Sequence, residues 1–219
     1  MPEWDRDSLQ ELRAAVWRRD LAAVRRACDA RPLEDVLQLM GDALLDDRDS
    51  PLADECAERL RRRGLDGDAE LAEVLEGATS ALRPIAVDLE ELGPLLEGDP
   101  VRGGGRIDLV TGEIWPGSPY DDPVDLDDEE LDDPERWLWV QAGSHDGWRD
   151  MAEFAAAVPD PALAQRLERA VQGRGAFRRF RAVLDEHPDE LTRFHRFADE
   201  RQRGRARRWL ADRGLRPTR

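Results

Sequence analysis

The helical spacing of apolar residues in the first 80 residues constrains the fold more than any other feature of this sequence. Ser8 and Glu11 fit a capping box ahead of Leu9, Leu12 and Val16. Further signals for helix starts and stops are Asp20, Pro32, Gly64 and Asp68. The pattern predicts five short amphipathic helices, which together form an all-helical module over residues 1–83. Such a module is typical of a scaffold rather than of a catalytic centre.

The pattern changes at Arg83-Pro84, where a second domain is expected over residues 84–219. Apolar residues alternate over 106–109 and 113–116 around a turn that contains Gly112, which predicts a β-hairpin. Strands are also predicted over 84–87 and 136–140. Helices are predicted for the rest of the domain, the last and longest over 188–212. The fold class is therefore α+β: a helical module, then a small antiparallel sheet packed with C-terminal helices.

Charge is distributed unevenly along the chain. All 33 basic residues are arginine, and the net charge is −16. Residues 1–99 hold 25 acids and 13 arginines (−12), residues 100–150 hold 14 and 4 (−10), and residues 151–219 hold 10 and 16 (+6). An acidic molecule repels DNA and anionic membranes at long range, whereas a basic C-terminal part can bind nucleic acid locally. We also expect the acidic and basic parts to attract each other.

Composition also indicates the compartment. Cys28 and Cys56 lie on predicted helices without metal-ligand spacing, which favours buried free thiols in a reducing cytoplasm. The sequence has no apolar run long enough to span a bilayer, and its first residues do not resemble a secretory signal. We therefore expect a cytoplasmic protein that does not associate with membranes. No cofactor or metal is predicted.

Several motifs of the second domain resemble those of a bacterial family. They are Asp108–Trp115, Gly147–Phe154, Gly173–Phe180, His187-Pro188 and Arg205–Leu210. Their order and spacing are similar to those of uncharacterised protein family number one hundred and fifty-eight, over residues 84–217. The resemblance implies a domain boundary near residue 83, with the helical module as an extension. It implies no substrate, cofactor or catalytic residue.

Two segments rich in charge invite a ligand-binding interpretation. The run from Gly173 to Phe180 lacks the spacing of a phosphate loop, so we expect a helix with Phe177 and Phe180 in the core. Arginines on the exposed faces of the last helices are candidates for nucleic-acid contact: Arg178, Arg181, Arg207 and Arg208. Residues 121–135 hold ten acids without the spacing of a calcium loop, which favours a solvated loop.

The last predicted helix contains the least easily explained feature. Arg201 and Arg205 share an arc with Phe194 and Trp209, so both must reach solvent or find carboxylate partners. An internal ion pair is the favoured interpretation. The alternative is an anion-binding site that includes His195.

The preferred function is a non-catalytic binding or regulatory protein with a protein partner, because no nucleophile, base and anion-stabilising group can be assembled from the sequence. One alternative is nucleic-acid binding through the arginine-rich C-terminal helices. The other is an enzyme that acts on an anionic substrate through Arg201, Arg205 and His195.

Overall fold

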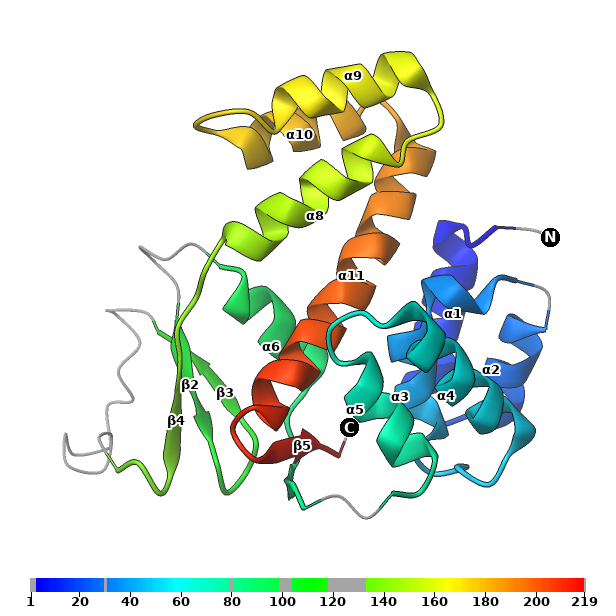
Figure 1. Cartoon of the computed structure of the whole chain (residues 1–219), viewed down its shortest axis with the longest axis vertical. Coiled ribbons are helices and arrows are strands. Elements are labelled where there is room, and N and C mark those ends of the chain that lie inside the picture. The colour runs from blue at the N-terminus through cyan, green and yellow to red at the C-terminus, as the bar shows by residue number, and fades with distance from the viewer. Residues whose placement is uncertain (1–2, 30, 79–80, 99–103, 118–132, 219) are drawn as a thin grey trace.

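A computed structural model describes residues 3–29, 31–78, 81–98, 104–117 and 133–218. It confirms the α+β class, with a long central helix between two dissimilar parts. This helix is α11 (Pro188–Ala211). It runs between a cluster of N-terminal helices and a small sheet, with further helices at its N-terminal end (Figure 1).

The regular elements described before residue 79 are all helices. They are α1 (Arg6–Trp17), α2 (Leu21–Cys28), the 3₁₀ helix η1 (Leu33–Asp35), α3 (Leu37–Leu44), α4 (Pro51–Arg63) and α5 (Asp68–Leu75). Asp20 and Ser50 cap α2 and α4, and Gly64 ends α4 with φ +64°. The apolar stripes of these helices share one core, in which Cys28 and Cys56 are buried and free.

Two details of this module differ from the sequence-based expectation. The first helix begins at Arg6, and its capping box is formed by Asp5 and Ser8 instead of Ser8 and Glu11. Pro32 precedes η1 rather than a long helix, and α3 starts only at Leu37. Short polar side chains recur near residue 5, so sequence alone allows two plausible caps for one helix.

The second part contains two small sheets. The expected hairpin pairs β2 (Gly105–Asp108) with β3 (Ile114–Pro116), and β4 (Trp137–Val140) pairs with the other edge of β2, both antiparallel. β1 (Arg83–Ile85) instead pairs in parallel with β5 (Leu215–Pro217). The sequence does not predict β5, because its pairing partner β1 lies 132 positions earlier in the chain and no local pattern links the two segments. Between β1 and β2 lies α6 (Leu89–Leu96), which packs on α11.

Three more helices surround the N-terminal end of α11: α8 (His145–Ala156), α9 (Pro161–Ala170) and α10 (Ala176–Leu184). Their apolar faces meet around Phe154, Phe180 and Phe194, whose rings make edge-to-face contacts at 4.9–6.4 Å. Phe177 departs from expectation. It is 48% exposed, so only Phe180 is a core anchor of α10.

The buried apolar residues of the described chain form three clusters, and none includes residues from both sides of Arg83. The N-terminal module meets α11 mainly through charged groups. Glu200 accepts hydrogen bonds from the backbone amides of Gln38 and Leu39 at 2.9–3.1 Å and pairs with Arg63 at 3.0 Å. Arg203 and Arg207 both pair with Asp42, and Arg196 with Asp35.

A close backbone contact fixes the register of this interface. A Cβ atom at Gly204 of α11 would lie 2.2 Å from the carbonyl oxygen of Asp66, and one at Gly67 would lie 2.1 Å from the carbonyl oxygen of Gly204. Gly67 also has φ +75°, which favours glycine. The turn before α5 therefore meets α11 backbone to backbone.

Candidate functional site

A groove of about 470 Å³ lies where α8, α10 and α11 meet. Its apolar lining consists of Met151, Phe177, Phe180, Phe194 and Ala198. We call it the phenylalanine groove. A mostly apolar concavity with a few polar groups at its edge is the usual form of a ligand site.

The local sequence explains why Phe177 stands at the opening. Gly175 precedes α10 with φ +76°, so the chain turns sharply before the helix begins. Gly147 of α8 lies beside the Phe177 ring, because a Cβ at that position would be in ordinary contact with it at 3.4 Å. The ring is held against α8 on one side and open to solvent on the other.

The polar lining of the groove carries both signs of charge: three carboxylates, two arginines, His195 and Gln202. The charged residues are Glu97, Asp150, Asp199, Arg13 and Arg181. Arg181 pairs with Asp185 at 2.8 Å, and Arg13 with Asp199 at 3.1 Å. Partial burial lowers the pKa of His195, and the positive charges of Arg181 and Arg13 lower it further. His195 is therefore neutral at pH 7.

Arg205 lies beneath this groove with its guanidinium held between two carboxylates. Its Nε donates to Glu97 at 2.8 Å, and its two Nη atoms donate to Asp150 at 3.2 and 2.5 Å. Arg201 pairs with the same Asp150 at 3.4 Å and with Glu153 at 2.7 Å. Both arginines thus have internal carboxylate partners, and neither lines the groove that contains His195.

Burial dominates the electrostatics of these partners. It raises the pKa of Asp150 and of Glu97, while the arginine charges and hydrogen bonds oppose that rise. Gln202 also donates to Glu97 at 2.9 Å. The nitrogens of Arg205 are already engaged, so an external anion would have to displace a carboxylate to bind there.

The four proposed nucleic-acid contacts have different environments. Arg207 is 3% exposed and donates to Gln38 and Asp42, so it faces the N-terminal module. Arg208 is half exposed, 3.7 Å from Glu70 and from Asp212. Arg178 and Arg181 lie on the exposed side of α10. Four more exposed arginines lie on α9, on α10 or in the turn between them: Arg166, Arg169, Arg174 and Arg179. We call these six arginines together the basic surface of α9 and α10.

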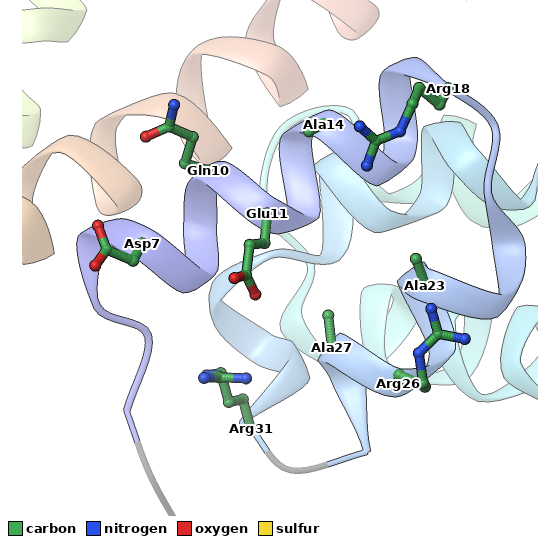
Figure 2. A pocket seen from close by; sticks show the side chains of 9 residues that line it. All are labelled: Asp7, Gln10, Glu11, Ala14, Arg18, Ala23, Arg26, Ala27 and Arg31. Atoms are coloured by element: carbon green, nitrogen blue, oxygen red, sulfur yellow. The ribbon is translucent and has the colours of Figure 1, made fainter.

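A second groove, of about 680 Å³, lies between α1 and α2 on the N-terminal module. Figure 2 shows Arg18 and Arg26 at one end, one on each helix, and Glu11 with Arg31 toward the other end. Three alanines line the space between the helices: Ala14, Ala23 and Ala27.

Other site types have less support. No group of His, Cys, Asp and Glu side chains suited to a metal ion occurs among the residues that the structure describes. No described helix is both long and apolar enough to cross a membrane. Most of the acidic segment 121–135 lies outside the described residues; Asp133 and Glu135, at its end, belong to the turn before β4.

Comparison with known proteins identifies the second part of the chain. The model of an uncharacterised protein family, UPF0158, matches residues 107–218, from β2 to β5. The chain belongs to this family. A UPF0158 protein of Pseudomonas aeruginosa is 28% identical over 137 residues, which cover 62% of this chain and 88% of that relative. No solved structure matches the chain. The UPF0158 family is uncharacterised, so its known members assign no activity to the phenylalanine groove.

Sequence reasoning identified His195, Arg201 and Arg205 but missed their surroundings. Glu97 and Asp150 come from α6 and α8, and no local spacing links them to α11. The helical angle of Phe177 is close to that of Phe180, so the sequence predicts that both rings are in the core. Only the position of α8 shows which of the two rings is covered.

Proposed function

We propose that this UPF0158 protein is a non-catalytic binding protein of the cytoplasm, and that a segment of a partner protein inserts an apolar side chain into the phenylalanine groove. The observation that carries the proposal is the half-exposed Phe177 ring at the opening of a groove that is also lined by the buried Phe180 ring and the partly buried Phe194 ring. The free buried thiols of Cys28 and Cys56 support a reducing compartment.

The polar edge of the groove indicates the character of that segment. Arg13 and Arg181 are only partly neutralised by surface carboxylates, because exposed ion pairs are weak. The lining carboxylates Glu97 and Asp150 are paired with Arg205, so an acidic residue beside the apolar anchor would gain charge–charge attraction on the side of the groove formed by Arg13 and Arg181. Aromatic anchors are favoured, since ring pairs add about 0.5–1.5 kcal/mol beyond the burial of apolar area.

Selection from a display library of random peptides against the full chain tests this proposal. We expect enriched peptides to share an aromatic or long aliphatic residue next to Asp or Glu. Phe177→Ser should abolish their binding, whereas Trp139→Ser, which alters an exposed ring on β4, should leave it unchanged. Peptides without an apolar anchor, or peptides that bind both variants equally, would contradict the proposal.

Nucleic-acid binding is a second candidate, favoured by the basic surface of α9 and α10. Residues 161–184 contain six arginines and a single acid, Glu168, although the whole chain is acidic. Among the described residues, Arg169, Arg174 and Arg178 have no carboxylate partner. Phosphates could therefore bind there without displacing an ion pair.

Fluorescence anisotropy with labelled duplex DNA and single-stranded RNA, at several salt concentrations, tests this candidate. Arg174→Gln/Arg178→Gln should weaken binding and reduce the salt slope by about 0.9 for each duplex phosphate that the protein no longer neutralises. Arg62→Gln, in the acidic module, is the matched control. Equal effects of the two sets of substitutions, or no binding at low salt, would remove this candidate.

A further inference from the structure

The arginines of the groove between α1 and α2 form no ion pair among the described residues, although this part of the molecule is rich in carboxylates. Residues 1–99 contain almost twice as many acids as arginines. Arg19, Arg25, Arg59 and Arg61 each pair with one of these acids. Within the described residues, none of the three arginines of the groove does so: Arg18, Arg26 and Arg31. Their positive charge is therefore available to a ligand.

The groove has two chemically different ends. Arg18 and Arg26 form a basic end without a lining carboxylate beside them, whereas Glu11 and Asp7 accompany Arg31 toward the other end (Figure 2). A simple polyanion lying along the whole groove would meet Glu11. The ligand that fits is anionic at one end only and carries hydrogen-bond donors at the other.

The second end also offers a flat cationic surface. The Arg31 guanidinium stacks over the Trp4 ring at 5.3 Å, which holds its plane in place. Its Nε is buried and has no hydrogen-bond partner among the residues that the structure describes. Guanidinium planes stack on nucleobases, and the carboxylate of Glu11 can accept from an exocyclic amino group. Between the ends, the alanine floor leaves room for a sugar.

The dimensions of the groove fit a ligand with a base at one end and phosphates at the other. Glu11 lies on α1 and Arg18 is the C-cap residue of that helix, seven positions later, which places them about 10 Å apart along the helix axis. The groove volume of about 680 Å³ lies within the usual range for small-molecule sites. We propose that the groove between α1 and α2 binds a nucleoside phosphate, with its phosphates at Arg18 and Arg26 and its base at Glu11 and Arg31.

This site is separate from the phenylalanine groove and does not depend on the function proposed for it. Isothermal titration calorimetry of the full chain with ATP, pyrophosphate and adenosine as probes tests the proposal. We expect saturable ATP binding with one site per chain. Pyrophosphate should bind at least tenfold more weakly than ATP because it lacks the base, and adenosine more weakly still because it lacks the charge.

Three variants locate the site. Arg18→Gln/Arg26→Gln should weaken ATP binding at least tenfold, whereas the matched control Arg6→Gln/Arg48→Gln, which removes two exposed arginines elsewhere, should not. Ala23→Glu places a carboxylate at the basic end. Because residue 23 is the third residue of α2 and Asp20 is its cap, this glutamate also completes a capping box and preserves the fold. Ala23→Glu should therefore abolish binding without lowering the melting temperature.

Three results would overturn the proposal: no heat of binding at millimolar ATP, equal loss of affinity in the groove and control variants, or pyrophosphate binding as tightly as ATP. The last result would show a site for phosphate groups alone and exclude a nucleoside.

Discussion

At the scale of single residues, the environment of an arginine matters more than its position in the sequence. Arg205 lies along the apolar stripe of α11, and Arg18 lies at the end of the amphipathic helix α1. Arg205 lies between Glu97 and Asp150, while Arg18 lines a groove and has no carboxylate partner in the described part of the chain. The sequence predicted that Arg205 needs a partner. It could not identify the free arginines, because their isolation depends on how α1 and α2 pack.

Removing the Arg205 side chain tests its structural role. Arg205→Ala leaves Glu97 without its arginine and leaves Asp150, which is 1% exposed, with Arg201 at 3.4 Å, so the free energy of unfolding should fall by about 3–5 kcal/mol. Arg205→Met keeps the packing of the stem and should cost less. Urea unfolding of both variants measures this. If Arg201 and Arg205 held an anion instead, Arg205→Ala would be at least as stable as wild type, and phosphate would raise the melting temperature of wild type only.

The pKa of His195 should respond to its basic neighbour. Burial lowers it and Arg181 lowers it further, so Arg181→Gln should raise it toward the ordinary value of about 6.5. Below that value the unfolded chain binds more protons than the folded one. Stability attributable to His195 is therefore present above pH 6.5 and is lost as the pH falls through the lowered pKa. An NMR titration of the ring protons gives the pKa, and an unchanged value in Arg181→Gln would contradict this cause.

At the scale of elements, α3 is capped by a residue that lies 162 positions away. Val36 precedes α3 without a side-chain cap, and Glu200 of α11 accepts from the amides of Gln38 and Leu39 instead. Burial raises the pKa of Glu200, while Arg63 and the two amides oppose the rise. A helix that depends on a distant cap has a start that local sequence signals cannot reveal. This explains why the sequence placed the helix at Pro32.

Substitution of Glu200 tests this long-range cap. Glu200→Gln removes the charge that two amides and Arg63 share, so we expect a loss of about 1.5–3 kcal/mol in unfolding free energy. Amide hydrogen exchange at Gln38 and Leu39 should become faster than at the other end of α3. The comparison is Glu190→Gln, which removes a surface pair with Arg193 and should cost under 1 kcal/mol. Unchanged exchange at Gln38 would show that α3 does not need this cap.

The order of helices and strands along the chain was more predictable than the elements against which each of them packs. The start of α5 at Asp68, the hairpin and the helices from α8 to α11 follow from periodicity, caps and Gly or Pro signals. The interface of α11 does not, since charged residues on a helix normally indicate a solvated face. Arg196, Glu200, Arg203 and Arg207 are buried there because the N-terminal module supplies complementary charges. A single helix pattern carries no information about that second surface.

At the scale of the whole molecule, the division at residues 83 and 84 remains a prediction that the packing supports. The apolar clusters of the described residues do not cross Arg83, so a chain of residues 84–219 would expose mostly charged groups of α11. We expect it to be soluble and to unfold cooperatively, at a lower temperature than the full chain. Circular dichroism melts measure this. A disordered spectrum for residues 84–219 would mean that the two parts form one domain.

Replacing Gly204 by alanine should change the stability of residues 84–219 alone and of the full chain in opposite directions. In residues 84–219 alone, Gly204→Ala should stabilise α11 by about 1 kcal/mol through helix propensity. In the full chain, the added methyl group would collide with the carbonyl oxygen of Asp66, 2.2 Å away, and should destabilise by about 1–3 kcal/mol. Chemical unfolding of all four proteins gives both signs. The same sign in both chains would contradict the close contact between α11 and the turn before α5.

The charged interface between α11 and the N-terminal module has a consequence for how a chain with two such parts evolves. The Pseudomonas relative is shorter than this chain, and the family match begins only at Ile107. A helix face rich in arginine and glutamate is stable both when exposed to water and when packed against the N-terminal module. An ancestor could therefore gain or lose that module without exposing an apolar, aggregation-prone surface. Gly204 differs from these charged residues, because the absence of a side chain is needed only where the N-terminal module packs against α11. Across the family, glycine at this position should be inherited together with the module, and descendants without the module should drift to alanine.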